Sequence, residues 1–283
     1  MQLPADLQPI DYLAIGHLAI DLTPQGPRLG GSAAYAALTA RALGWRAGIL
    51  TAWAEELPLG PLADLPIINL GAEKSSTFEN IYTPNGRTQR YSGDAPFLEF
   101  HFIPEAWRNP RILHLAPVAR EVSPRILKYL DNSFLGVTPQ GWLREWDAAG
   151  QVSVSHWEEA ATVLSRADAA VLAREDVLGD EGQLERLAAA CPLLIVTEGS
   201  AGATMYTQGE KHHISTPAVR TVVDPTGAGD IFAAAFFIQL YQNGDPLTAA
   251  RFASHAAARS VERAGLAGVP SREELYELAP EAL

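Results

Sequence analysis

The sequence has only one cysteine, Cys191, among its 283 residues. A single thiol cannot form an internal disulfide or a cysteine-based metal site, so we expect a reducing compartment and a cytoplasmic location. Basic residues are also scarce, since 21 Lys and Arg stand against 33 Asp and Glu, a formal net charge of -12. A field of that sign repels nucleic-acid phosphates and anionic lipids, so neither is an expected partner. The longest apolar run, residues 231–238, is far shorter than the roughly 20 residues that cross a bilayer.

The rest of the composition is that of an ordinary folded chain, with 47% hydrophobic and 19% charged residues. Short apolar segments typical of strands alternate with segments typical of helices, and no repeat or flexible linker separates them. We expect strands at residues 12–20, 46–53, 67–70, 112–116, 135–138, 169–173 and 193–197, and helices at residues 32–44, 157–166, 181–190, 231–241, 246–263 and 271–278. This alternation predicts a single α/β domain over residues 1–283, with a mostly parallel central sheet and helices on both faces.

One segment, residues 77–91, departs from the alternation. Its β-prone residues lie on either side of Asn85-Gly86, a dipeptide that favours tight hairpin turns. We therefore predict a β-hairpin over residues 77–91.

The most informative segment is residues 222–232, with the sequence Val-Val-Asp-Pro-Thr-Gly-Ala-Gly-Asp-Ile-Phe. Small residues lead directly into an apolar helix, so the N–H groups of Gly227, Ala228 and Gly229 are expected at a helix amino terminus, where an anion binds. Asp230, in the first helical turn, would repel that anion unless it has another task. Accepting the proton of a hydroxyl that attacks a phosphate is such a task. The alternative is that Asp230 only favours the helix dipole and the glycines only make a tight turn.

The segment at residues 224–230, Asp-Pro-Thr-Gly-Ala-Gly-Asp, resembles the carboxy-terminal signature of the ribokinase-like (PfkB-type) carbohydrate and nucleoside kinases. Other segments follow in that family's order along nearly the whole chain: residues 16–21 ending in Asp21, the Gly30-Gly31 pair, residues 197–202, residues 252–254, and Gly265. The resemblance implies a three-layer ribokinase-like fold. It also implies that Asp230 activates the acceptor hydroxyl and that the amides of residues 227–229 form an anion hole.

The resemblance assigns roles at both ends of the substrate site. Asp21 would hold hydroxyl groups of the acceptor, and Gly30 and Gly31 would let the backbone approach it; local turns are the alternative reading of all three residues. The nucleotide would lie against a second set of residues, Thr197, Gly199, Gly202 and Ser254. An ordinary connection after a strand, and a serine that faces solvent, are the alternatives there.

Two metal sites also follow from the resemblance. Asp224 and the backbone of Thr226 would lie beside a monovalent cation, K⁺, that stiffens the anion hole. Residues 173–176, Ala-Arg-Glu-Asp, stand where the family has Asn-x-x-Glu, which helps to organise Mg²⁺ and phosphate. The asparagine is absent, and Asp176 is the candidate to replace the glutamate.

Further departures from the family concern the acceptor and the lid. Tyr35 stands where most related sugar kinases have an asparagine, which predicts a more apolar acceptor pocket with Tyr35 beside Asp21. Residues 138–144 lack the family's Asp-Pro-Asn, and Trp142 and Trp146 either form a pocket wall or belong to the core. Residues 22–29 are too few and too rich in proline and glycine to form two lid strands. We therefore expect a reduced β lid, made by the hairpin at 77–91, and a monomer or a dimer not formed through the lid.

These observations predict an ATP-dependent kinase that transfers the γ-phosphoryl group to a hydroxyl of a small sugar, polyol or nucleoside. The expected cofactors are ATP and Mg²⁺, with K⁺ as a further cation. The alternative is a non-catalytic member that binds a ligand or a nucleotide for regulation, which the changes at residues 173–176 and at Tyr35 favour. The retained Asp230 and its glycines favour the kinase.

Overall fold

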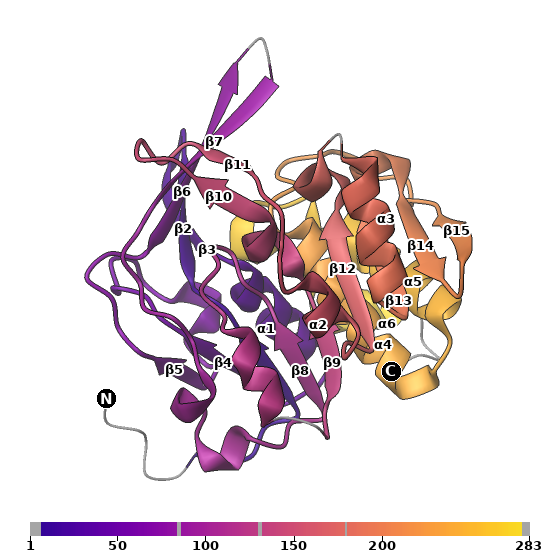
Figure 1. Ribbon diagram of the computed structural model, residues 1–283, viewed down its shortest axis with the longest axis horizontal. Coiled ribbons are helices and arrows are strands. Elements are labelled where there is room, and N and C mark those ends of the chain that lie inside the picture. The colour runs from indigo at the N-terminus through magenta and orange to yellow at the C-terminus, as the bar shows by residue number, and fades with distance from the viewer. Residues whose placement is uncertain (1–6, 84–85, 130–131, 179, 279–283) are drawn as a thin grey trace.

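The computed structural model describes residues 7–83, 86–129, 132–178 and 180–278 (Figure 1). Within these residues, a nine-stranded sheet has the order β15-β14-β13-β12-β9-β8-β1-β4-β5. Its strands are β1 (Tyr12–Ile15), β4 (Ala47–Thr51), β5 (Ile67–Asn69), β8 (Ile112–Leu115), β9 (Phe134–Val137), β12 (Ala169–Ala173), β13 (Leu193–Thr197), β14 (Ala203–Thr207) and β15 (Glu210–Ile214). Strands β5 to β13 of this order pair in parallel, and β14 and β15 extend the β13 edge in antiparallel fashion. The predicted mostly parallel sheet is confirmed.

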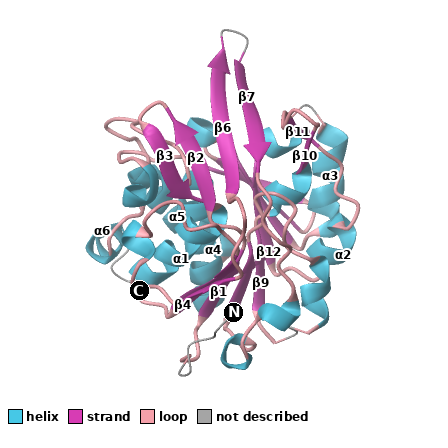
Figure 2. Cartoon of the chain, turned by 90° about the vertical axis from the view of Figure 1, so that its left-hand side faces the viewer, coloured by secondary structure: helices cyan, strands magenta, loops and turns pink. Residues whose placement is uncertain are grey.

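Helices cover both faces of this sheet, as Figure 2 shows. One face carries α1 (Ser32–Ala42), α4 (Ala228–Asn243), α5 (Pro246–Ser260) and α6 (Arg272–Leu278), and the other carries α2 (Ala160–Leu164) and α3 (Glu181–Ala190). Each face has its own cluster of buried apolar side chains. Helix α4 is buried around its whole circumference over residues 231–238, because it packs between the sheet and α1 and α5. The predicted three-layer α/β fold is confirmed.

No helix in the described parts of the chain combines the length and the hydrophobicity that crossing a bilayer requires.

A second sheet forms the lid, and it corrects the sequence-based prediction. Four strands, β2 (Ala19–Thr23), β3 (Gly26–Gly30), β6 (Ser76–Thr83) and β7 (Gly86–Ser92), pair in the order β3-β2-β6-β7 and stand above the main sheet in Figures 1 and 2. The predicted hairpin is present as β6 and β7, although residues 84–85 of its turn lie outside the described residues. The expectation that residues 22–29 cannot supply lid strands is wrong, and the lid is not reduced.

The physical reason is the position of Asp21. Strand β2 already begins at Ala19, and Asp21 lies within it, opposite Arg28 of β3. Thr23 pairs with Gly26, so the connection needs only a two-residue turn, which the Thr23 hydroxyl supports by donating to the Gly26 carbonyl at 2.8 Å. Because the lid has all four strands, its size does not exclude a dimer formed through the lid, and the oligomeric state stays a prediction.

Aromatic side chains hold the base of the lid. Phe78 of β6 is buried, and its ring lies 5.3 Å from that of Tyr91 on β7, which in turn lies 4.2 Å from that of Trp146. Trp146 ends β10 (Arg144–Trp146), which pairs with β11 (Val152–Val154) in a small separate sheet. The lid thus packs on the segment around Trp146.

Candidate active site

A pocket of about 970 Å³ lies between the lid and the carboxyl ends of the parallel strands. Ligands of open α/β sheets bind at that edge, because the connecting loops there leave a crevice. Its lining comes from the lid (Asp21, Phe78, Asn80), from the ends of β12 and β13 (Ala173, Asp176, Thr197, Gly202) and from the loop and first turn of α4 (Thr226 to Asp230). Residues from distant parts of the sequence therefore meet in one cavity.

The amino terminus of α4 opens directly into this pocket. Gly227 caps the helix with a φ of 80°, and a Cβ there would lie 2.3 Å from Cε1 of Tyr35. Both the left-handed backbone and the close approach of Tyr35 require a glycine. In the described part of the chain, the N–H groups of Gly227 and Gly229 have no intramolecular acceptor, whereas that of Ala228 donates to the Pro225 carbonyl at 3.2 Å. Of the three amides predicted to bind an anion, Gly227 and Gly229 are the ones free to do so in this conformation.

Asp230 lies in the first turn of α4, and its carboxyl has an unusual environment. Burial raises its pKa to about 6, and the nearby carboxylates of Asp176 and Asp21 act in the same direction. A hydrogen bond from the Ser32 hydroxyl and the positive charge of Arg144 oppose that shift. A carboxylate with such a pKa is ionised at neutral pH and is a stronger base than an exposed aspartate.

The acceptor residues predicted from the sequence meet on the other side of Asp230. A Cβ on Gly30 would lie 2.6 Å from Oδ2 of Asp21 and 3.7 Å from Cε2 of Tyr35, so the two side chains flank the same glycine. Gly31 has a φ of 100°, and a Cβ there would lie 2.5 Å from the His17 carbonyl. Burial, followed by the charges of Asp21 and Asp230, raises the pKa of the Tyr35 phenol far above its usual range. Tyr35 thus presents a neutral hydroxyl beside two carboxylates.

The residues predicted to bind the nucleotide line the same pocket. Thr197 ends β13, Gly199 and Gly202 follow it, and a Cβ on Gly202 would lie 2.2 Å from the Ile214 carbonyl. Ser254 is 6% exposed on α5, and its hydroxyl donates to the Ser215 carbonyl at 3.1 Å. Ser254 therefore does not face open solvent, and its oxygen remains able to accept a hydrogen bond.

Asp176 is the carboxylate predicted to take part in Mg²⁺ binding. Its Oδ2 accepts the Ala173 N–H at 2.9 Å, its Oδ1 accepts the Gln140 side-chain amide at 3.4 Å, and burial raises its pKa. The described residues contain no group of three His, Cys, Asp or Glu side chains able to hold a metal ion. Mg²⁺ commonly keeps several water ligands and needs only one or two carboxylates beside substrate phosphates, so this site fits such an ion.

Arg144 is a pocket residue that sequence reasoning missed. It lines the pocket from β10, and its guanidinium lies 5.5 Å from the centre of the Phe78 ring. Its positive charge lowers the pKa of both Asp176 and Asp230. Trp142, two residues earlier, is buried and stacks on Trp157 at 4.7 Å, so for Trp142 the core alternative holds.

The chain is similar in sequence to known kinases. Residues 158–272 match the family described as pfkB family carbohydrate kinase. The chain is 24% identical to the cytidine kinase of Thermococcus kodakarensis over 84% of this chain and 91% of that protein. It is 42% identical to the ribokinase of Bacillus subtilis over a shorter stretch, 30% of this chain and 29% of that protein.

Solved structures of other proteins have the same fold as this chain. A pyrophosphate-dependent kinase of the ribokinase family, complexed with a pyrophosphate analog and myo-inositol, matches with a TM-score of 0.78 and 18% identity over 96% of this chain and all of that one. The ribokinase of Arabidopsis thaliana, complexed with ribose and ATP, matches with a TM-score of 0.72 and 17% identity over 96% of this chain and 99% of that one. Sequence similarity to the pfkB family carbohydrate kinases thus covers residues 158–272, and the chain shares the fold of solved ribokinase-family kinases.

Proposed function

We propose that this kinase transfers the γ-phosphoryl group of ATP to a hydroxyl of a small sugar, polyol or nucleoside, with Asp230 as the general base. The observation that carries the proposal is that one pocket is lined by Asp230, by Asp21 and Tyr35, and by the loop after β13. Phosphoryl transfer needs positioning, charge stabilisation and one base more than it needs covalent chemistry. This pocket offers each of them.

The proposed steps follow from the residues present. Asp21 accepts hydrogen bonds from acceptor hydroxyls, and the Asp230 carboxylate takes the proton of the attacking hydroxyl. The N–H groups of Gly227 and Gly229, at the positive end of α4, bind the transferred phosphoryl oxygens. Arg144 adds a fixed positive charge on the side of Asp176. Mg²⁺, held through Asp176 and the phosphates, would neutralise the charge of the polyphosphate.

The donor end of the pocket favours a nucleotide over bare pyrophosphate. Beyond Ser254, the pocket is lined by apolar side chains, namely Val219, Val222, Ala257, Ala258 and Val261. A flat apolar base fits such a lining, whereas pyrophosphate would leave it exposed to water. We therefore propose ATP as the donor. A test of the donor must compare ATP with pyrophosphate.

A ligand screen tests the substrate classes. Thermal unfolding should be measured with sugars, polyols and nucleosides, each with Mg²⁺ and a non-hydrolysable ATP analogue, with Mg²⁺ and pyrophosphate, or alone. A ligand that binds only the folded state raises the Tm, by RT ln(1 + [L]/Kd) in free energy. We expect the ATP analogue to raise the Tm and one acceptor class to add to it. A rise with pyrophosphate and none with the ATP analogue would contradict the proposed donor.

The acceptor specificity is predicted to depend on Tyr35. Tyr35→Asn removes an aromatic wall and leaves an amide beside Asp21, so we expect a changed order of kcat/KM among acceptors, by about 10-fold or more for the best one. ATP affinity should stay within about threefold, because the residues proposed to hold the nucleotide, Thr197, Gly199, Gly202 and Ser254, are unchanged. Steady-state kinetics with a panel of acceptors provide the measurement. An unchanged order of acceptors would exclude Tyr35 from the acceptor site.

The pH dependence of turnover is predicted to follow Asp230. The base must be ionised, and its pKa is about 6, so kcat/KM should fall about tenfold per pH unit below that value and level off above it. Arg144 lowers this pKa, so Arg144→Met should move the whole profile to higher pH. The pH profiles of the two proteins, measured with the acceptor that the screen identifies, give the comparison. A profile that Arg144→Met leaves in place would contradict the assignment of the titrating group.

A further inference from the structure

The lid strand β3 carries a guanidinium on the same face as the acceptor-binding carboxylate. Asp21 and Arg28 are direct partners in the antiparallel pair of β2 and β3. Residues directly opposite each other in such a pair have their side chains on the same face of the sheet. The face of the lid that carries Asp21 therefore also carries Arg28.

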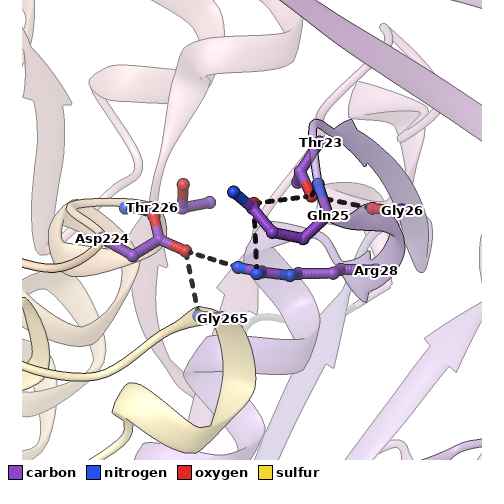
Figure 3. Close-up of polar contacts among 7 residues, drawn as sticks. All are labelled: Thr23, Gln25, Gly26, Arg28, Asp224, Thr226 and Gly265. Carbon is purple, nitrogen blue, oxygen red and sulfur yellow. Dashed lines mark hydrogen bonds and ion pairs between the residues drawn. The ribbon is translucent and has the colours of Figure 1, made fainter.

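Arg28 spans the gap between the lid and the loop that precedes α4, as Figure 3 shows. Its Nη1 lies 3.2 Å from Oδ2 of Asp224, a residue 196 positions later in the sequence. Its Nη2 also donates to the Gln25 side chain at 3.4 Å, in the turn between β2 and β3. The side chains of Arg28 and Asp224 are 33% and 16% exposed, so the ion pair is partly shielded from water.

Asp224 is the residue that holds the loop in front of α4. Its Oδ1 accepts the Thr226 N–H at 3.0 Å, and its Oδ2 accepts the Gly265 N–H at 3.1 Å in addition to the Arg28 guanidinium. Thr226 immediately precedes Gly227, the cap of α4. One carboxylate thus connects the anion-binding loop, the segment at Gly265 and the lid.

This arrangement does not fit the monovalent cation implied at Asp224 and Thr226. The carboxylate already has two amide donors and one neutralising cation, and a second cation on it would stand against the Arg28 guanidinium. We propose that Arg28 is a positioning residue that supplies the fixed positive charge of this loop in place of a monovalent ion. Because this charge is carried on strand β3, the ion pair ties the lid to the loop at the amino terminus of α4.

This proposal rests on the proposed function. A test without any substrate can nevertheless fail or succeed independently of the kinase activity. Thermal unfolding of the wild type should be compared in KCl and in choline chloride at equal ionic strength. We expect the two Tm values to agree within about 1 °C, because Arg28 already neutralises Asp224 in the wild type and K⁺ does not bind there. A K⁺-specific rise of the wild-type Tm would overturn the proposal, and this arm requires no variant to fold.

The Arg28→Met variant keeps most of the side-chain stem and removes the charge. In choline chloride its Tm should be lower than that of the wild type, and K⁺ should restore about 3 °C or more by occupying the vacated side of Asp224. Arg28→Lys should respond to K⁺ as little as the wild type. Arg46→Met is the matched control, because it breaks an arginine–aspartate pair, with Asp11 at 2.8 Å, far from the pocket. It should show no preference for K⁺.

Amide hydrogen exchange over residues 224–229 gives a second readout that a general loss of stability would not reproduce. We expect exchange at Thr226 to increase in Arg28→Met in choline chloride, to return toward the wild-type rate in KCl, and to be unaffected in Arg46→Met. Unchanged exchange at residues 224–229 in Arg28→Met, or an increase that K⁺ does not reverse, would refute the role given to Arg28. None of these results depends on whether an acceptor is phosphorylated.

Discussion

Replacing Asp230 with asparagine is expected to lower turnover by about 10²–10⁴-fold, the usual contribution of a general base. The amide cannot accept the hydroxyl proton, while the loop at residues 226–229 and the residues at the donor end of the pocket are unchanged. The affinity for ATP should therefore stay within about threefold, because the substitution removes an interaction of the transition state. Steady-state turnover and equilibrium binding of ATP together separate the two effects.

The same substitution is expected to stabilise the fold. Burial is the largest of the causes that raise the pKa of Asp230 to about 6, from an ordinary value of 3.8. A carboxyl whose pKa is higher in the folded state binds its proton more tightly there, so the folded state is penalised as pH rises from about 4 and the penalty is complete above about 6. Asparagine carries no such penalty, and we expect the free energy of unfolding to increase by about 1–3 kcal/mol at pH 7.

Urea unfolding of the wild type and Asp230→Asn near pH 7.5 and near pH 4.5 tests the sign of this effect. The difference in stability between the two proteins should be larger at the higher pH. Asp64→Asn, which changes an exposed carboxylate remote from the pocket, is the control and should show neither gain nor loss. Near-normal turnover of Asp230→Asn on the acceptor would contradict the role of general base.

Gly227→Ala is the substitution with the second largest expected effect. Gly227 has a φ of 80°, and the Cβ added by alanine would lie 2.3–2.5 Å from three atoms of the Tyr35 ring. Since Tyr35 is buried beside Asp21, the ring cannot move without disturbing the acceptor end of the pocket. We expect turnover to fall by about 10²-fold or more, as misplacement of catalytic groups by about 1 Å can cause.

Gly209→Ala is the matched control for backbone strain. Gly209 has a φ of 82°, and a Cβ there would have no atom within 4 Å, so this change includes the strain without the collision. It should destabilise the fold by about 1 kcal/mol, whereas Gly227→Ala should lose a further 1–3 kcal/mol, approximately the range for overpacking a filled site. If the two substitutions reduce the free energy of unfolding equally in urea, the close approach of Tyr35 to Gly227 is absent in solution.

The main sheet could be predicted because its strands and helices are each specified by local patterns. The apolar runs that become β8, β9, β12 and β13 are short, separated and buried on both faces, as in a parallel sheet with helices on each side. The lid could not be predicted in the same way. Strand β3 contains Gly26, Pro27 and Gly30, residues that favour loops, and it forms because pairing with β2 outweighs that local preference.

Some residues of the candidate site could be predicted from the sequence and others could not. The residues in contiguous motifs, such as Asp230 and Gly227, could be assigned candidate roles from the order of residues around them. Arg144 and Arg28 could not, because their importance comes from charges that the fold brings close: Arg144 acts on Asp176 and Asp230, and Arg28 contacts Asp224 across the lid. No local pattern around either arginine specifies these partners, which lie between 32 and 196 positions away in the chain.

The most direct test of phosphoryl transfer is ³¹P NMR of the purified kinase with Mg²⁺, ATP and the acceptor that thermal unfolding identifies. Parallel samples should contain pyrophosphate in place of ATP, and Asp230→Asn in place of the wild type. With ATP, the wild type is predicted to produce ADP and an equal amount of a phosphomonoester of the acceptor, while Asp230→Asn produces neither at a comparable rate. Formation of the phosphomonoester by Asp230→Asn at the wild-type rate, or by the wild type from pyrophosphate alone, would contradict the account.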